Sequence, residues 1–538
     1  MKTLSQTQLE ESPQKSDQRI SGSSTGVVSR PVEVGRSGKD QNPIVRTRSG
    51  KVRGTVVNGV YTFKGISFAA PPYGANRMRP PQPVESWSGV RDALNFGPKS
   101  FQPPYPPVID PSVLPELAGP GEDCLNLNIW SPDPGAAGLP VMVWIPGGGF
   151  EFHATSASPW YDGSRFARDG IVCVTINYRV GAEGFLYLGN GSGNFGLLDQ
   201  IAALEWVRDN IAAFGGDPNN VTVFGESGGA ISLAMLLAIP RAEGLFRRAI
   251  AQSGAAHCVL SEESGCLVGL RLAKKLGVEA TLEAIAALPV DRVLAAQEAL
   301  KADLIARPDP QLWGKELVAS MMLWQPVVDG KIIPRPPIER IAAGAGADVD
   351  VIIGTNIDEQ RLFLVPGSID LMTPEALAGA VAMYGLPVEK MLTAYRAAYP
   401  KASAGDLFAA IQTDWYWRIP AIRLADAHAK NAKNASTYMY EFAWRTPLLN
   451  GRLGACHGLE ITFVFDTLGK GTEGVLGADP PQKLADIVHA AWVAFARTGN
   501  CGWPRYDLNR RTTMRFDIEP GVVDDPRRPE RTLWEGVR

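Results

Sequence analysis

The stretch VTVFGESGGAISLAMLLA, Val221–Ala238, decides the fold class of this chain. It begins with the β-branched and aromatic residues of a buried strand and ends with an apolar, helix-forming run. Between the two, Ser227 stands in GESGG, which fits the G-x-S-x-G pattern of a sharp strand-to-helix turn that lifts a serine hydroxyl above the sheet edge. The stretch predicts an α/β fold with Ser227 as candidate nucleophile. The alternative is a small polar residue in a glycine-rich turn.

Other apolar runs extend this pattern. The spacing of Leu197–Gly215, which ends in glycine, predicts a helix. Strands that alternate with helices predict a mainly parallel sheet with helices on both faces. The predicted buried strands are Leu139–Ile145, Ile171–Tyr178, Val221–Phe224 and Asp350–Thr355.

A serine nucleophile needs a histidine base, and the elbow motif sets the chain order as serine, acid, histidine. His428 and His489 lie in alanine-rich helical patterns, which predicts structural roles. His257 follows Ser227 too closely to leave room for an acid on a later strand. His457, in a glycine-flanked loop after the strand-like run TYMYEF, is therefore the predicted base.

An acid and an oxyanion site would complete the chemistry. Asp358 and Glu359 both follow the apolar run DVIIGT, and the residues alone do not choose between them. Gly147–Gly149 follow another predicted strand, where a glycine loop can turn backbone N–H groups toward a developing alkoxide. Each such donor is worth about 2.7–4 kcal/mol in the transition state. The alternative is a glycine turn without chemistry.

Composition excludes several classes of protein. The net charge of -3 argues against nucleic acid or an anionic membrane as partner, and the apolar runs are shorter than the ~20 residues that span a bilayer. Residues 1–43 carry no aromatic residue and predict a disordered polar leader before a domain at 44–538. Six dispersed cysteines without metal-like spacing predict free structural thiols and no metal or cofactor.

From about residue 44 to 518, the chain resembles the type-B carboxylesterase/cholinesterase-like family of α/β-hydrolases. The resemblance implies the α/β-hydrolase fold: a central, mostly parallel sheet flanked by helices, with loop and helical insertions over the active site. The motifs that carry it are, in order, GKVRG, FKGISFAAPPYG, EDCLNLNIW, PGGGF, NYRVGAEGFL, GNFGLLDQIAALEWVRDNIAAFGGDPNNVTVFGESGG, QSG, PVVDG, GTNIDE, HGLEITFVF and WPRYD.

The resemblance also implies a mechanism, in which a serine carboxylesterase hydrolyses esters through an acyl-enzyme without metal or cofactor. Its implied triad is Ser227, Glu359 and His457, and its implied oxyanion hole is formed by the amides of Gly148, Gly149 and Gly228.

Four positions depart from the family pattern. Gly228 stands where alanine is common, Pro146 where histidine or tyrosine precedes the glycine loop, and Gln360 where glycine follows the acid. The last departure weakens the assignment of the acid. Ser100 stands where the family often has the disulfide partner of Cys124, so we expect Cys124 to be free and the compartment to be reducing.

The sequence says less about the substrate. The proline-rich run Phe101–Gly121 predicts a long surface loop that edges a binding site. The stretch Ser100–Gly121 lacks the tryptophan that captures choline in cholinesterases. Phe150, Phe152 and Asp414–Arg418 either line an apolar pocket or belong to the core.

We therefore predict a carboxylesterase for small to medium neutral or aromatic esters. The alternatives are a hydrolase for a specialised ester (a toxin, carbamate, pyrethroid or aromatic diester) and a cholinesterase-like binding protein. The predicted partner is a small-molecule ester, with neither nucleic acid nor membrane, and the predicted state is a monomer or weak homo-oligomer. The predicted location is the cytoplasm, with secretion or the periplasm as alternatives if a native signal peptide was removed.

Overall fold

The computed structural model describes residues 42–105, 115–189, 191–365, 367–432 and 434–537. Except for its last two residues, the predicted leader at 1–43 lies outside this described part and stays a prediction. The proline-rich loop is described on both sides of residues 106–114.

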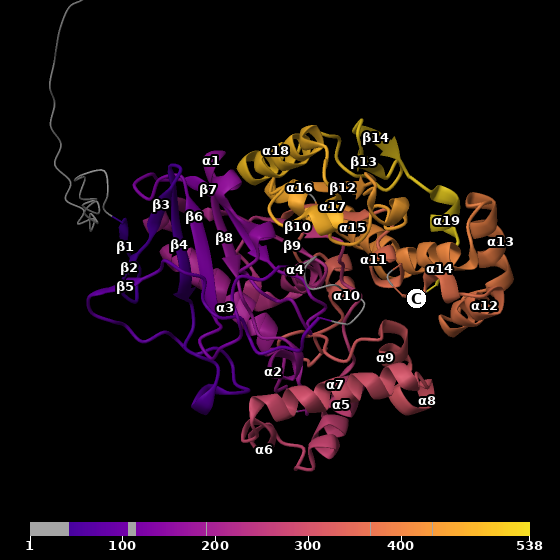
Figure 1. Ribbon diagram of the computed structural model, residues 1–538, viewed down its shortest axis with the longest axis horizontal. Coiled ribbons are helices and arrows are strands. Elements are labelled where there is room, and N and C mark those ends of the chain that lie inside the picture. The colour runs from indigo at the N-terminus through magenta and orange to yellow at the C-terminus, as the bar shows by residue number, and fades with distance from the viewer. Residues whose placement is uncertain (1–41, 106–114, 190, 366, 433, 538) are drawn as a thin grey trace, which may run out of the picture. The chain divides into compact units, whose positions relative to one another are not determined.

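One large mixed sheet organises the described residues (Figure 1). Its inner strands, from β13 to β8, run parallel, and antiparallel strands close both edges. A smaller sheet combines β1 (Ile44–Arg46), β2 (Lys51–Arg53) and β5 (Val90–Asp92). The spatial order of the large sheet is β14 (Gly521–Asp524), β13 (Thr512–Phe516), β12 (Thr437–Phe442), β11 (Asp350–Asn356), β10 (Arg248–Gln252), β9 (Gly216–Glu226), β7 (Leu139–Ile145), β8 (Val172–Ile176), β6 (Asn126–Ser131), β4 (Val60–Ser67) and β3 (Thr55–Val57).

The four predicted strands are confirmed as β7, β8, β9 and β11. Every residue of β8 and β10 is buried, as expected for parallel strands covered on both faces. The predicted helix is confirmed as α3 (Phe195–Asn210), which continues directly into a 3-10 helix, Ile211–Phe214. It ends at Gly215, which has φ of 89° and so adopts the left-handed conformation that glycine tolerates best.

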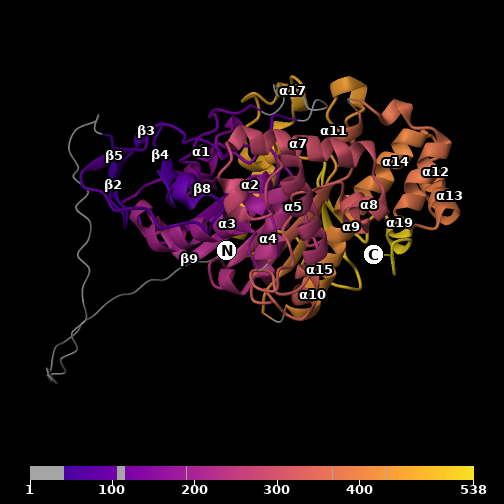
Figure 2. The same cartoon turned by 90° about the horizontal axis from the view of Figure 1, so that it is seen from below.

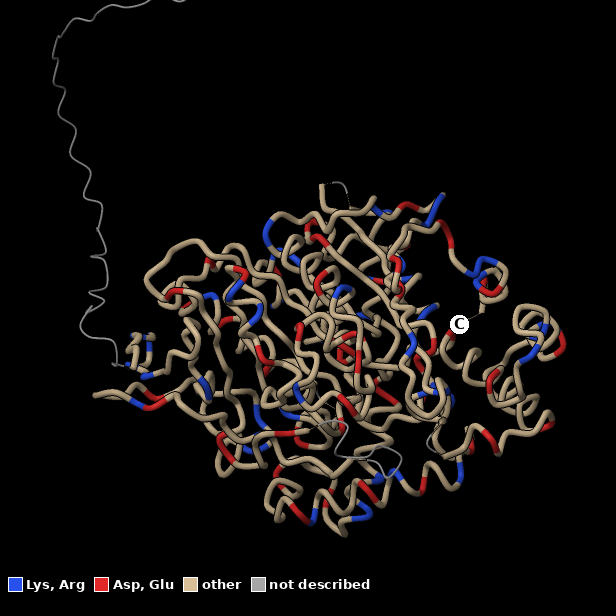
Figure 3. Tube along the Cα trace, turned by 45° about the horizontal axis from the view of Figure 1, so that its top comes forward, with Lys and Arg blue, Asp and Glu red and all other residues tan. Residues whose placement is uncertain are grey.

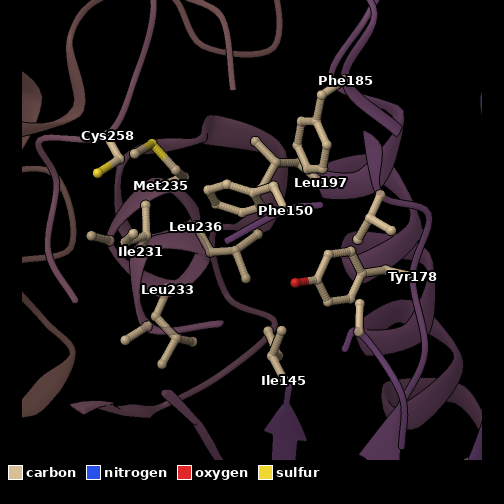
Figure 4. Packing of buried hydrophobic residues seen from close by; sticks show 14 of the residues in the cluster. Ile145, Phe150, Tyr178, Phe185, Leu197, Ile231, Leu233, Met235, Leu236 and Cys258 are labelled. Atoms are coloured by element: carbon tan, nitrogen blue, oxygen red, sulfur yellow. The ribbon is translucent and has the colours of Figure 1, made fainter. Parts of the chain in front are cut away.

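Helix α4 (Gly228–Ala238) follows the elbow and is buried along its whole length. Such a helix must be apolar on all sides, which explains the run AISLAMLLA. Figure 4 shows Ile231, Leu233 and Leu236 of this helix in one cluster with Phe150 and Tyr178. The elbow therefore stands on a rigid core.

Two helical insertions interrupt the strand order, as the fold prediction expects. Figures 1 and 2 show the helices of the first insertion together, beside the sheet. The first insertion, between β10 and β11, contains α5 (Glu262–Leu276), α7 (Val290–Ala306), α8 (Pro310–Trp313) and α9 (Lys315–Ser320). The second, between β11 and β12, contains α12 (Pro374–Met383), α13 (Val388–Ala398), α14 (Ala404–Thr413) and α15 (Ile419–Asn431).

Figure 3 shows charged residues of both signs interspersed along the described trace. None of the helices in the described ranges combines the length and apolar character needed to cross a membrane. All six cysteines lie in the described ranges as thiols rather than disulfides, and Cys124 is fully buried, so the prediction of reduced cysteines is confirmed.

Candidate active site

Ser227 occupies a strained turn between β9 and α4. Its backbone has φ of 54° and ψ of -122°, values that cost energy in a non-glycine residue and cluster at functional sites. The N–H of Ser227 donates to the carbonyl of Gln252 at 2.9 Å, and its carbonyl accepts from Ile231 at 2.9 Å. These bonds tie the turn to β10 and to the first turn of α4, so the surrounding structure holds the strain.

The flanking glycines let the strand and helix approach closely. A Cβ atom on Gly229 would lie 2.1 Å from the carbonyl oxygen of Ile145, and one on Gly225 would lie 2.7 Å from the same oxygen. Neither distance accommodates a carbon atom without movement of the backbone of β7. The spacing of the motif thus follows from packing between β7, β9 and α4.

His457 and Glu359 are in direct contact. Nδ1 of His457 lies 2.7 Å from Oε2 of Glu359, and the N–H of His457 donates to the Glu359 carbonyl at 3.1 Å. Glu359 is fully buried, and its Oε1 accepts from the N–H of Asn356 at 2.7 Å. Asp358 points elsewhere: its Oδ2 accepts from Arg445 at 2.9 Å and from the N–H of Ala455 at 3.1 Å. Of the two carboxylates left open above, Glu359 is the one that contacts the histidine.

The other nitrogen of His457 faces Glu226. Nε2 lies 3.0 Å from Oε1 of Glu226, at ion-pair distance but without the alignment of a hydrogen bond. Within the described part of the chain, no hydrogen bond joins His457 Nε2 to the Ser227 hydroxyl. Catalytic hydrogen bonds are often long or misaligned before substrate binds, so this arrangement is compatible with a serine–histidine pair.

Three buried glutamates set the charge of His457. Burial alone would lower its pKa, but Glu226, Glu359 and Glu460 outweigh that effect and raise the pKa of His457 to about 9. Burial raises the pKa of Glu226, and the neighbouring positive charge of His457 counteracts that rise. Burial also raises the pKa of Glu460, which accepts hydrogen bonds from Asn356 and Gln252. The site therefore favours an imidazolium that is balanced by carboxylates.

The predicted oxyanion glycines lie together beside Ser227. Gly148 and Gly149 have φ of 96° and 60°, so the loop after β7 uses the left-handed conformation at two successive positions. A Cβ on Gly228 would lie 3.1 Å from the nitrogen of Gly149, which places these two backbones in contact. The Tyr178 hydroxyl donates to the Pro146 carbonyl at 3.0 Å and holds the start of the loop.

A cavity of about 500 Å³ brings these groups to one space. Its charged lining includes Lys301 and Glu151, which form an ion pair at 3.0 Å and so neutralise one another. Apolar side chains supply much of the rest, among them Phe152, Ile231, Met322, Leu362, Phe363, Tyr416 and Trp417. This lining favours a neutral, apolar ligand next to Ser227.

The aromatic residues left open by the sequence divide between core and cavity. Phe150 is fully buried in the core, whereas Phe152 lines the cavity. Within Asp414–Arg418, Trp415 is buried, and the next two residues line the cavity. From the proline-rich loop, Tyr105 bonds His153, which also lines the cavity, so the described part of that loop edges the site as expected.

Of the four remaining histidines, two lie apart from the triad candidates and two line the cavity. His428 lies in α15 and bonds Thr437 at 2.8 Å, and His489 lies in α18 (Gln482–Thr498) and bonds the Val464 carbonyl at 2.7 Å. Both are buried and structural, as predicted. His257 and His153 line the cavity, which the sequence did not indicate.

Sequence reasoning also missed Glu226 and Glu460 as partners of His457. The available signal was their position in the sequence. In GESGG, Glu226 lies one residue before Ser227, and in HGLE, Glu460 lies three residues after His457. A buried acid so close to a candidate nucleophile or base is a reason to expect a perturbed titration.

Comparisons with known proteins identify the family of this chain. Residues 41–534 match the model of the carboxylesterase family. The para-nitrobenzyl esterase of Bacillus subtilis is 39% identical over 506 residues, covering 91% of this chain and 97% of the relative. The phenmedipham hydrolase of Pseudarthrobacter oxydans is 36% identical, covering 89% and 94%.

Solved structures give the same result. The crystal structure of a Geobacillus stearothermophilus carboxylesterase at pH 6.2 superposes with a TM-score of 0.79 at 37% identity, covering 91% of this chain and 99% of the other. The predicted α/β-hydrolase fold and family resemblance are thereby confirmed. The chain belongs to the carboxylesterase family and is a carboxylic ester hydrolase.

Proposed function

We propose that this protein hydrolyses carboxylic esters of small to medium neutral or aromatic substrates through an acyl-enzyme formed on Ser227. One observation carries the proposal: a serine on a strained elbow shares an apolar cavity with a histidine that is bonded to a buried carboxylate. This is the combination of nucleophile, base and orienting acid that serine hydrolases use.

In the proposed first half-reaction, His457 accepts the proton of the Ser227 hydroxyl while the serine oxygen attacks the ester carbonyl carbon. The resulting oxyanion accepts hydrogen bonds from the amides of Gly148, Gly149 and Gly228. Collapse of the tetrahedral intermediate breaks the bond to the alcohol, which leaves with the proton held by His457. The acyl group remains on Ser227.

In the second half-reaction, water takes the place of the alcohol. His457 accepts a proton from the water, which attacks the acyl carbon, and then returns the proton to Ser227 as the acid leaves. In both half-reactions, Glu359 fixes the tautomer of His457 and stabilises the imidazolium. For both steps, Nε2 of His457 must turn from Glu226 toward the serine oxygen.

The apolar cavity of about 500 Å³ supports the proposed substrate class. Its volume fits a small or medium ester, and the paired charges of Lys301 and Glu151 leave no net charge from these two groups to attract an ion. The relative named para-nitrobenzyl esterase is consistent with an aromatic ester as substrate.

The decisive experiment compares the wild type with Ser227→Ala on p-nitrophenyl esters of rising chain length, with and without a phosphonate inhibitor. We expect Ser227→Ala to lose roughly 10⁴-fold or more of kcat and the phosphonate to label Ser227 in the wild type. Full activity of Ser227→Ala would refute the mechanism. Wild-type inertness on every chain length would instead favour the binding-protein alternative.

We further propose that the protein works as a monomer or weak homo-oligomer in the cytoplasm, without cofactor and without nucleic acid or membrane as partner. Sedimentation velocity tests the oligomeric state, and cell fractionation tests the location. Activity that survives exhaustive dialysis against a chelator supports catalysis without a cofactor.

A further inference from the structure

The imidazole of His457 is covered by an aromatic ring. The ring centroids of Trp417 and His457 lie 4.3 Å apart, with an angle of 35° between the planes. Trp417 belongs to the π-helix Asp414–Arg418, which joins α14 to α15, and it lines the cavity with His457. Such wider helical turns occur frequently at functional sites, because they present side chains that a regular helix would direct elsewhere.

Gln360 holds the indole in this position. Nε1 of Trp417 donates to Oε1 of Gln360 at 3.1 Å. The backbone N–H of Gln360 in turn donates to the hydroxyl of Thr413, the last residue of α14, at 3.2 Å. The two hydrogen bonds connect the acid loop to the helix that carries the tryptophan.

Two successive residues therefore control two sides of one imidazole. Glu359 bonds the Nδ1 edge of His457, and Gln360 fixes the tryptophan that covers the ring. The ring of Phe363, from the helix α11 (Arg361–Leu364), lies 5.4 Å from the imidazole and narrows the remaining space. A glycine in place of Gln360 would have no side chain to accept the hydrogen bond from Nε1 of Trp417.

We propose that Trp417 and Gln360 are positioning residues for His457: the indole stabilises the imidazolium and restricts the ring, and Gln360 holds the indole. The proposal rests on the proposed function, in which His457 is the general base. An aromatic ring attracts a cation placed over it, so the contact strengthens when His457 takes up the serine proton. That interaction is stronger in the transition state than in the ground state and therefore raises kcat.

The groups that face His457 from neighbouring elements define the background for a pH test. Glu226 at the end of β9, Glu359 after β11, and Glu460 before α16 (Ile461–Phe465) all favour the imidazolium. None of them is altered by substitutions at Trp417 or Gln360. A change in the acid limb of kcat/KM in such variants therefore reports on the aromatic contact.

The test measures kcat, KM and the pH profile of kcat/KM on p-nitrophenyl butyrate. We expect Trp417→Leu to lower kcat, measured on the plateau above about pH 9, by roughly 3- to 30-fold. The acid limb should also move to lower pH, because the imidazolium loses its aromatic neighbour. Trp417→Phe, which keeps a ring, should retain most of both properties. Gln360→Leu should have an intermediate effect on kcat that disappears in the Trp417→Leu background.

Tyr416→Leu is the matched control. Tyr416 belongs to the same π-helix and lines the same cavity, and its ring packs against Trp417 rather than His457. We expect this variant to change KM and to leave the acid limb in place. If Trp417→Leu behaves in the same way, Trp417 is a wall of the substrate cavity and the proposal is overturned.

Two further readouts keep the outcomes separate. If Trp417→Leu does not fold, as judged by thermal unfolding, Trp417→Phe and Gln360→Leu carry the test, and an unchanged kcat in Gln360→Leu overturns the role of Gln360. Phosphonate labelling of the wild type at Ser227 tests the proposed mechanism itself. Wild-type labelling together with an unshifted Trp417→Leu profile rejects the positioning role alone.

Discussion

Nε2 of His457 lies 3.0 Å from Oε1 of Glu226, the residue that immediately precedes Ser227 in the chain. The candidate base is therefore paired with a second buried carboxylate at the nitrogen that must receive the serine proton. Because the pKa of His457 is raised to about 9, the imidazole is largely protonated at neutral pH in this conformation. The pair must separate, or lose its proton, before His457 can act as a base.

The first prediction concerns this pair. Since only the neutral imidazole accepts the serine proton, kcat/KM should rise with pH and level off above about 9. Glu226→Gln removes a negative charge that favours the imidazolium, so the pKa of His457 falls and the acid limb moves down by about 1–3 pH units. A pH–rate profile from pH 5 to 10 measures the acid limb of the wild type and that of Glu226→Gln. An unmoved limb in Glu226→Gln would show that this carboxylate does not control His457.

The second prediction separates two adjacent acids. Glu359→Gln keeps the shape of the side chain but cannot hold the correct tautomer of His457, so kcat should fall by roughly 10⁴-fold. Asp358→Asn disturbs the contacts to Arg445 and Ala455 and should reduce kcat less than about tenfold. Steady-state kinetics on one p-nitrophenyl ester compare the two. A larger loss in Asp358→Asn would contradict the assignment.

The third prediction contrasts neighbouring glycines. A Cβ on Gly228 meets the nitrogen of Gly149 at 3.1 Å, a contact that small shifts relieve, and the amide survives substitution. Gly228→Ala should therefore stay active. A Cβ on Gly229 would lie 2.1 Å from the Ile145 carbonyl oxygen, so Gly229→Ala should lower both activity and Tm. Total loss of activity in a folded Gly228→Ala protein would show that the elbow needs a glycine there.

The fourth prediction concerns a buried ion pair. Arg179 and Asp199 are fully buried and bonded at 2.7 Å, so Arg179→Met leaves an unpaired buried carboxylate and should lower the free energy of unfolding by about 3–5 kcal/mol. The exposed pair of Arg510 and Asp524 is the control, for which Arg510→Ala should leave the free energy of unfolding nearly unchanged. Urea unfolding measures both. Equal losses would contradict the role of burial.

Local patterns predicted much of the fold, because strand burial leaves a direct mark on composition. The run Leu139–Ile145 is observed with the predicted bounds. The helix Leu197–Gly215 differs only at its ends, where hydrogen-bond geometry, rather than apolar spacing, decides the boundary. Ser227 and His457 could be predicted for a related reason, because each stands in a glycine-containing segment that interrupts a regular pattern.

Contacts between segments that are distant in the chain could not be predicted from the sequence. Asp358 and Glu359 follow the same strand, and the choice between them depends on Arg445, which draws Asp358 away from the histidine. The stacking of Trp417 on His457 depends on a π-helix whose apolar spacing does not differ visibly from that of an α-helix. Phe150 enters the core because its backbone has φ of 64°, which side-chain type does not reveal.

The position of β9 in the middle of the sheet has a consequence during translation. Ser227 leaves the ribosome 230 residues before His457 (457 − 227), and β11 and β12 are synthesised in between. A nascent chain that ends before them exposes the edge of β10, a strand that is buried on all sides in the finished sheet. The growing enzyme therefore carries its nucleophile long before its base, and until β11 is synthesised the open edge of β10 is a place where strands can pair wrongly.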